Sequence, residues 1–314
     1  MSKYAHEPLS FQGLKTVPIQ KRGGKVRVEH FGKPYTGGGI AGLLDSLPHI
    51  LAADSFRSVV DALANARARN KMILWGLGGH VIKCGLAPLL IDLMRRGYAT
   101  GFALNGAAAI HDFEIAIAGQ TSEDVEAVLP DGSFGAAEET GREFNAALNC
   151  AEGFGESLGK HLEKIADPQF SCASLLCETY RNSTPVTVHV AIGTDTPHTH
   201  PTANGDALGH ATHHDFRLLC SLVKEINDGG VYLNVGSAVV LPEVFLKAVS
   251  VVRNLGHPLA SFTTVNFDFL QHYRPKVNVV ERPHARAGGH GYSITGHHEI
   301  MIPLLAAALI ESKA

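Results

Sequence analysis

The chain has 314 residues, 45% of them hydrophobic, which is enough apolar material for the core of one large α/β domain. Its 27 Lys and Arg residues nearly balance 30 Asp and Glu residues, so neither nucleic acid nor a membrane surface is expected as a partner. The first twelve residues lack the apolar segment of a signal peptide, and five scattered cysteines without a CxxC pair indicate no disulfide framework. We therefore expect a cytoplasmic protein.

Residues 1–38 are polar and irregular, and we expect them to form an N-terminal arm ahead of one domain, residues 39–314. Lys25–Phe31 alternates in the manner of an edge strand. The arm nevertheless carries apolar side chains that could be buried against a neighbouring subunit: Tyr4, Phe11, Val26, Val28, Phe31 and Tyr35. This composition favours a homo-oligomer, a tetramer or a dimer, and a disordered tail is the alternative.

Two helices are predicted next, over Ile40–Ala53 and Phe56–Arg69, with Asp54 or Ser55 capping the second. The apolar run Met72–Trp75 then predicts a strand that ends in a glycine-rich turn at Gly76–His80. From Val81 to Met94 apolar residues recur at helical spacing, which predicts a crossover helix.

A second strand, turn and helix follow at Gly101–Leu104, Asn105–Gly106 and Ala107–Ala118. Two buried strands joined by a helix indicate a parallel sheet. Ligands of such sheets bind beyond the carboxyl ends of the strands, so His80, His111 and Asp112 are expected to face a pocket. The turn glycines would let backbone N–H groups approach an anion.

The remaining elements alternate between helix and strand. Helices are predicted in Gly135–Ile165 (with a break), Ser171–Tyr180, Asp215–Asp228, Leu241–Leu255 and Glu299–Glu311, and strands at Pro185–Ile192, Val231–Val235, Ala260–Phe267 and Lys276–Val280. Gly193–His214 has no periodicity and is predicted to be a functional loop.

Histidine is unusually frequent, with 18 residues, and many lie in that loop. His198 and His200 are spaced to point the same way on an extended segment, and His210 and His213 could add ligands from the start of a helix. Imidazole and carboxylate ligands suit a divalent metal, with zinc the first choice and iron, nickel or manganese the others. The alternative is an exposed polar loop that binds nothing.

The motifs taken together resemble the deoxyhypusine synthase family over roughly residues 72–308. The matching segments include Asp92–Tyr98, the Asn105–Asp112 turn, Thr184–Asp195, Asp215–Leu219, Gly229–Gly236 and Ile302–Leu305. The resemblance implies a single Rossmann-like parallel sheet flanked by helices, an oligomer with active sites between subunits, and NAD as a cofactor. By position in these motifs, the candidate cofactor-binding residues are Gly78, Gly79, Asn105, Gly106, Gly236, Ser237, Thr263 and Thr264.

The chain departs from this family where the catalytic lysine is expected. The family transfers an aminobutyl group from spermidine through a lysine imine, but no lysine occurs between Lys276 and Lys313, and the nearest counterpart is Arg282. Because arginine stays protonated, it cannot form an imine. The sequence therefore predicts that deoxyhypusine synthase activity is absent.

Histidines and carboxylates remain as candidates for catalysis. We select His80, His111, Asp112, Asp195 and His290, because each follows a strand, opens a helix or lies in a glycine-rich segment. Helix capping is the alternative role for the two aspartates. We further expect Asp195, His198 and His200 to share a site with His80 or His111.

Three functions remain open. The first is an enzyme on the deoxyhypusine synthase scaffold that acts on a small polar substrate with metal-assisted or histidine acid/base catalysis. The second is an NAD-dependent, amine-processing transferase or oxidoreductase. The third is a non-catalytic protein that binds a small molecule.

Overall fold

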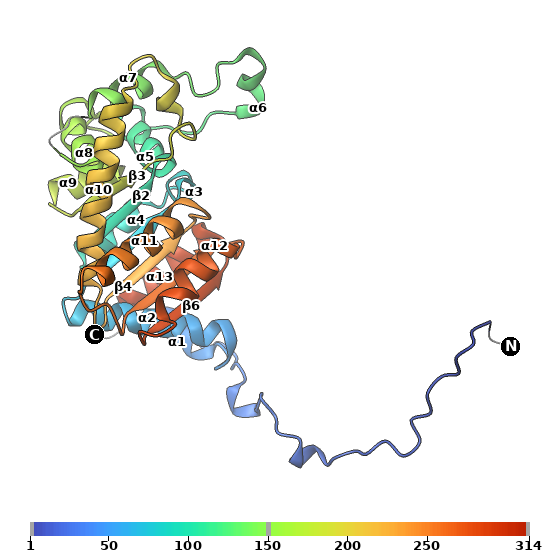
Figure 1. Cartoon of the computed structure of the whole chain (residues 1–314). Helices are drawn as coiled ribbons and strands as arrows, with labels where there is room; N and C mark the ends of the chain where they lie inside the picture. The colour runs from blue at the N-terminus through green and yellow to red at the C-terminus, as the bar shows by residue number, and fades with distance from the viewer. Residues whose placement is uncertain (1–2, 149–151, 312–314) are drawn as a thin grey trace.

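The fold is built on one six-stranded parallel sheet of order β3-β2-β1-β4-β5-β6, seen in a computed structural model that describes residues 3–148 and 152–311 (Figure 1). The strands are β1 (Ile73–Leu77), β2 (Gly101–Asn105), β3 (Val186–His189), β4 (Val231–Val235), β5 (Thr263–Asp268) and β6 (His290–Thr295). This confirms the predicted α/β class and the single Rossmann-like parallel sheet.

Helices follow the strands and cover both faces of the sheet. They are α1 (Gly39–Ser46), α2 (Leu51–Ala68), α3 (Gly79–Lys83), α4 (Ala87–Arg95), α5 (Gly106–Ala118), α6 (Val125–Val128), α7 (Glu138–Ala146), α8 (Phe154–Ile165), α9 (Leu175–Arg181), α10 (Gly205–Glu225), α11 (Val240–Asn254), α12 (Tyr273–Pro275) and α13 (His298–Glu311).

The two faces of the sheet are covered by different helices because successive residues of a strand point to opposite sides. In β1, Ile73, Trp75 and Leu77 belong to the larger core, with α2, α4, α5 and α13. Leu74 belongs to the smaller core, with α10 and α11. All five residues of β1 are buried, which explains their continuous apolar run.

The strand order reverses between β1 and β4. From β1 the chain proceeds to β2 and β3 on one side, and from β4 to β5 and β6 on the other. At such a reversal the loops beyond the carboxyl ends separate, and ligands of open α/β sheets bind there. A ligand-binding site is therefore expected at the carboxyl edge around β1.

The predicted crossover helix after β1 is interrupted. It consists of α3, which ends at Lys83, and α4, which begins at Ala87. Gly85 between them has φ +75°, a left-handed conformation that glycine adopts at little cost. The apolar periodicity continues across the break, so the sequence pattern alone did not reveal it.

The histidine-rich loop is partly helical, contrary to the prediction for Gly193–His214. α10 begins at Gly205, where the Asn204 side chain accepts hydrogen bonds from Asp206 N and Ala207 N. The buried residues of α10 recur at helical spacing, and polar residues between them hid this periodicity: Leu208, Ala211, Asp215, Leu219, Leu222 and Val223.

Three further predictions of local structure are wrong. Lys25–Phe31 contains a 3-10 turn at Val28–His30 instead of a strand, and Lys276–Glu281 is a π-helix. α2 begins at Leu51, three residues before the predicted cap Asp54. The sixth strand, β6, was missed because its glycine- and histidine-containing sequence lies at the edge of the sheet, mostly exposed.

Residues 3–29 extend away from the sheet and its helices (Figure 1), whereas Lys33 N donates to Ser46 O at the end of α1 and His30 O accepts from His49 N. Their apolar side chains are exposed, with Phe11 at 76% and Val28 at 78% of full accessibility. Cys150 lies outside the described residues. Within the described part of the chain, no helix has the length and hydropathy needed to cross a membrane.

Candidate functional site

A cavity of about 810 Å³ lies at the carboxyl edge beside β2, where Ala107 and His111 of α5 face the segment that follows β3. Its charged lining is mainly acidic and consists of Glu114, Glu123, Glu139, Glu143, Asp195 and one cation, Lys83. Its apolar lining includes Ile110, Ile117, Val125, Phe134 and Ile165. The cavity thus combines several negative charges with a hydrophobic wall, and we call it the acidic cavity.

His111 in the acidic cavity is oriented by a hydrogen-bonded chain. Thr121 Oγ1 donates to a carboxylate oxygen of Glu114, and His111 Nδ1 lies 2.7 Å from the same hydroxyl oxygen. Because the hydroxyl has one hydrogen and Glu114 accepts it, His111 Nδ1 must be the donor to Thr121. In the neutral ring this leaves Nε2 unprotonated, which is the form needed for a general base.

Glu114 stabilises this arrangement from a half-buried position. Its second oxygen accepts a hydrogen bond of 3.1 Å from Thr140 Oγ1. Burial raises the pKa of Glu114, but the contacts with His111, Thr121 and Thr140 outweigh it and hold the pKa below its ordinary value. Glu114 is therefore a carboxylate near neutral pH. Sequence reasoning missed both Glu114 and Thr121, although Glu114 lies one helical turn from His111.

Asp195, a predicted catalytic residue, also lines the acidic cavity. Its carboxylate lies against the first turn of α5, where a Cβ added to Gly106 would come within 2.0 Å of Asp195 Oδ2. Asp195 is 8% exposed, and Oδ2 has no hydrogen-bond partner. Burial raises the pKa of Asp195 to about 6. A buried carboxylate oxygen without a partner is costly, so a cation in the cavity would stabilise it.

Asp112 lies in the core instead of the cavity. It is fully buried, and its two oxygens accept hydrogen bonds from Ser174 Oγ (2.6 Å), Leu175 N (2.7 Å) and Leu176 N (2.8 Å). Two of these bonds satisfy backbone N–H groups in the first turn of α9, which have no partner within the helix. Asp112 therefore has the helix-capping role that the sequence left as the alternative.

Three other predicted residues lie at the opposite edge of the sheet. β5 and β6 are parallel and pair Thr263 with His290, so both residues are at the amino ends of their strands. Thr264 hydrogen-bonds Val279 O at 2.7 Å. Since the loops at the two edges are separated by the length of the strands, His290, Thr263 and Thr264 do not reach the acidic cavity.

The predicted metal ligands are not brought together. His200 pairs with Glu138 at 3.2 Å, whereas His210 and His213 are exposed on α10. His198 Nε2 is buried and has no partner, and burial lowers the pKa of His198. Among the described residues, the cluster with ligand spacing is His80, Cys84 and Glu299. Of the residues expected to share one site, the structure places Asp195 and His111 in one cavity.

The six remaining cofactor candidates lie at the carboxyl edge, where β1, β2 and β4 end. A Cβ on Gly78 would meet Gly236 O at 2.0 Å, and one on Gly79 would meet the Ala107 Cβ at 2.9 Å. Asn105 caps α5 through Ala108 N, and Ser237 Oγ accepts from Leu241 N. Gly78 and Gly79 are therefore positions that only glycine fits, and Asn105 and Ser237 hold the starts of α5 and α11. The start of α3 would contribute little to the binding of a cofactor phosphate, because a helix of five residues carries only a small dipole.

A larger cavity of about 1080 Å³ lies at the amino edge of the sheet, lined by Arg67, Lys71, Lys224 and His257 among others. Part of its positive charge is already paired, since Arg69 and Lys71 contact Asp228 at 2.8 and 3.4 Å. The acidic cavity, at the carboxyl edge and with an oriented histidine, is the better candidate.

No family model and no curated protein matches this sequence. Solved structures do match. A putative LOR/SDH protein from Methanococcus maripaludis S2 aligns with 83% of this chain and 70% of its own, with a TM-score of 0.52 and 15% identity. A putative deoxyhypusine synthase from Entamoeba histolytica aligns with 88% of this chain and 94% of its own, with a TM-score of 0.53 and 10% identity.

AgrE is a third similar structure. Its unliganded form aligns with 82% of this chain, with a TM-score of 0.56 and 18% identity, and its ternary complex with ornithine and NAD+ aligns with 84%, with a TM-score of 0.55 and 14% identity. This chain spans about one third of AgrE, 32% and 34% in the two structures. At identities this low, the structural match shows a shared fold and no more. The chain has the Rossmann-like architecture found in LOR/SDH-like proteins and in deoxyhypusine synthase.

Proposed function

We propose that this chain is an enzyme that acts on a small aliphatic amine, which it binds as a cation in the acidic cavity. The observation that carries the proposal is that Asp195, whose buried carboxylate has one unpartnered oxygen, lines the same cavity as the oriented base His111. A neutral donor would leave the negative charge of the carboxylate unpaired, whereas an ammonium group would both donate a hydrogen bond and balance the charge.

The lining favours an amine attached to a short alkyl chain. Glu114 and Asp195 supply negative charge near α5, and Ile117, Phe134 and Ile165 supply apolar surface for methylene groups. The similar protein AgrE was solved with ornithine, a molecule of this chemical class. An amine substrate also agrees with the sequence resemblance to a family that acts on spermidine, although its catalytic lysine is absent here.

His111 is the proposed general base. Its Nε2 takes a proton from the bound ammonium or from a water molecule, while Nδ1–H remains bonded to Thr121. Glu114, which accepts the Thr121 hydrogen, stabilises the imidazolium that forms. Such a positioned base contributes roughly 10²- to 10⁴-fold to a rate.

NAD is a second component of the proposal, favoured by the AgrE complex with ornithine and NAD+. Two of the residues predicted to bind NAD, Thr263 and Thr264, lie at the other edge of the sheet, so no step is assigned to the cofactor. An NAD-dependent amine-processing enzyme therefore remains the second candidate function, ahead of a non-catalytic binding protein.

Calorimetric titration with putrescine, ornithine and spermidine, each with and without NAD+, tests the proposal. At least one amine should bind, and Asp195→Asn should weaken it about tenfold or more, because a charge-assisted hydrogen bond contributes about 1.5 to 3 kcal/mol. Since the pKa of Asp195 is about 6, affinity should fall as the pH drops from 7 to 5 and the carboxylate is protonated. His111→Asn should retain binding and lose turnover.

The matched control is Asp206→Asn, which removes an exposed carboxylate from α10. It should bind the amine as the native chain does. Equal amine affinity in the native chain and Asp195→Asn would contradict the proposal, and so would preferential binding of succinate, a dianion of similar size.

We also propose that the chain forms a homo-oligomer through residues 1–38, the arm ahead of the domain at 39–314. The exposed apolar residues of the arm would bury surface on a second copy at about 25 cal/mol per Å². Light scattering at micromolar concentration should give a multiple of the 33.5 kDa chain mass, and deletion of residues 1–38 should reduce it. A monomeric full-length chain would contradict this.

A further inference from the structure

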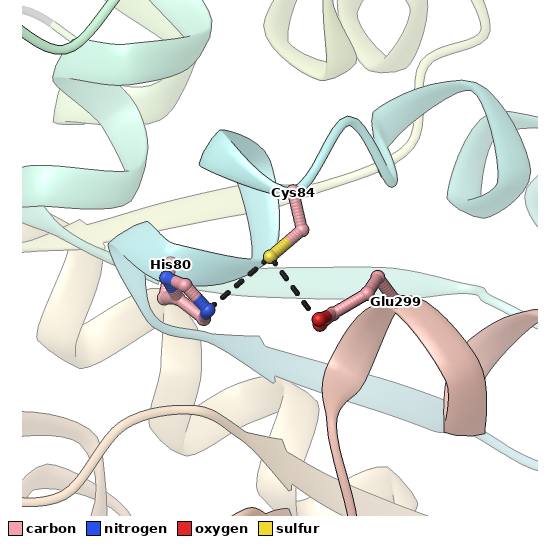
Figure 2. A group of neighbouring side chains, drawn as sticks. All are labelled: His80, Cys84 and Glu299. Atoms are coloured by element: carbon pink, nitrogen blue, oxygen red, sulfur yellow. Dashed lines mark hydrogen bonds between the residues drawn. The ribbon is translucent and has the colours of Figure 1, made fainter.

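Three side chains that sequence analysis did not group lie together at the carboxyl edge, outside the acidic cavity (Figure 2). His80 and Cys84 are one helical turn apart, on α3 and at its C-cap, and Glu299 is in the first turn of α13. His80 Nε2 lies 3.3 Å from Cys84 Sγ, and Cys84 Sγ lies 3.7 Å from Glu299 Oε2. Figure 2 shows the three side chains pointing toward one another.

The spacing agrees with that of a four-coordinate metal site. With Zn–S of about 2.3 Å and Zn–N or Zn–O of about 2.0 Å, tetrahedral angles put neighbouring ligand atoms about 3.5 Å apart. The two measured distances lie on either side of this value, and all three ligand atoms lie within 4.8 Å of one another. Small side-chain rotations would complete the geometry, because His80 and Glu299 are exposed.

The charges of the cluster also favour a divalent cation. Burial and the neighbouring carboxylate of Glu299 raise the pKa of the Cys84 thiol, so the thiol keeps its proton and donates it toward Glu299. A divalent ion would replace this proton, and a thiolate and a carboxylate would together neutralise the ion.

A buried histidine packs beside the cluster. His298 is 1% exposed, yet its Nδ1 has no hydrogen-bond partner. Its ring packs edge-on against His80 with centroids 5.6 Å apart, and its Nε2 lies 3.3 Å from Phe267 O. His298 is not among the ligand atoms that lie within 4.8 Å of one another, so its role is to pack against the ring of His80.

We propose that His80 Nε2, Cys84 Sγ and Glu299 Oε2 bind one divalent ion of borderline softness, such as Zn²⁺, with a fourth position open to solvent. Thiolate, imidazole and carboxylate are the donor types that Zn²⁺ takes in proteins, and three protein ligands leave the open position of a catalytic centre. None of the three residues lines the acidic cavity, so the proposal stands or falls independently of amine binding.

Cobalt titration of the metal-free full-length chain tests the site. Co²⁺ should produce near-ultraviolet thiolate-to-cobalt absorption that saturates at one equivalent, and Zn²⁺ should displace it. Because the thiol is protonated beforehand, binding should release about one proton and tighten as the pH rises. Cys84→Ser should abolish the absorption, and Glu299→Gln should weaken Co²⁺ binding about tenfold or more.

Cys220→Ser is the matched control, since Cys220 is another free, partly buried cysteine, on α10. It should leave the cobalt spectrum unchanged. Absence of thiolate absorption in the native chain, or its persistence in Cys84→Ser, would overturn the proposal. If circular dichroism shows that Cys84→Ser does not fold, Glu299→Gln provides the test. Glu299 is exposed, so this variant should fold, and an unchanged Co²⁺ affinity in it would exclude the proposed site.

Discussion

Replacing Asp215 by Asn is expected to raise the free energy of unfolding by about 2 to 4 kcal/mol at pH 8. Asp215 is fully buried, and one oxygen, Oδ2, accepts hydrogen bonds from Gly155 N at 2.9 Å and Val188 N at 2.6 Å. The other oxygen, Oδ1, has no partner and lies 3.8 Å from His214 Nδ1. An asparagine can therefore keep both bonds and place its NH₂ group toward His214.

The effect should depend on pH in a defined direction. Burial raises the pKa of Asp215 from 3.8 to about 7 in the folded chain, and nearby Glu156 raises it further, against the backbone N–H groups that lower it. The stability that this group provides is present below pH 3.8 and is lost as the pH rises through about 7. The gain in the free energy of unfolding of Asp215→Asn over the native chain should therefore be largest at pH 8 and shrink toward pH 4.

Urea unfolding at pH 5 and pH 8 measures this difference. Other buried groups, such as Asp112 and His189, titrate in both proteins, so they cancel when the variant is compared with the native chain. Asp206→Asn, an exposed change on the same helix, should alter stability by less than about 0.5 kcal/mol. If Asp215→Asn is less stable than the native chain at pH 8, the hydrogen bonding described for the two Asp215 oxygens is wrong.

The same substitution at Asp112 should have the opposite sign. Both oxygens of Asp112 accept hydrogen bonds from Ser174, Leu175 and Leu176. Whichever way an asparagine side chain turns, its NH₂ group faces a backbone or hydroxyl donor and leaves that donor unsatisfied. Burial raises the pKa of Asp112 to about 6, so removal of its charge offsets part of this loss at pH 8. Asp112→Asn should therefore lower the free energy of unfolding by about 1 to 3 kcal/mol, most visibly as loss of the start of α9.

Urea unfolding at pH 8 also measures this change, and hydrogen exchange of the Leu175 and Leu176 amides locates it. Asp92→Asn on α4 is the control, because Asp92 is exposed and paired with Arg96 across one helical turn, at 2.7 Å. Unchanged protection of those amides in Asp112→Asn would show that the carboxylate does not cap α9.

Periodicity located the central strands well, because each has a uniform environment. β1, β2 and β4 are buried along nearly their whole length and read as continuous apolar runs. It failed at the edge strand β6, where the exposed positions carry no apolar signal, and in the first turns of α10, where histidines alternate with the buried residues. Both failures lie where only part of an element faces the core.

The positions of the candidate site residues were predicted with similarly mixed results. Asp195 and His111 do line one cavity at the predicted edge, because the carboxyl edge of a parallel sheet can be located from strand ends alone. His290 was misplaced because Gly288–Gly289 reads as a loop beyond a strand, whereas it precedes β6. Asp112 was misassigned because a carboxylate at the start of a helix can point into the cavity or into the core with the same sequence.

The sequence by itself determined the fold class, the buried strands and the edge of the sheet at which the candidate site lies, since these follow from local periodicity and strand direction. Only the tertiary structure decided which side chains meet there. Glu299 contacts Cys84, from which it is separated by 215 residues of sequence. Asp195, which follows β3, packs into the space beside Gly106 at the start of α5, which follows β2. Such contacts depend on how loops from separate strands pack, and no short-range pattern encodes that packing.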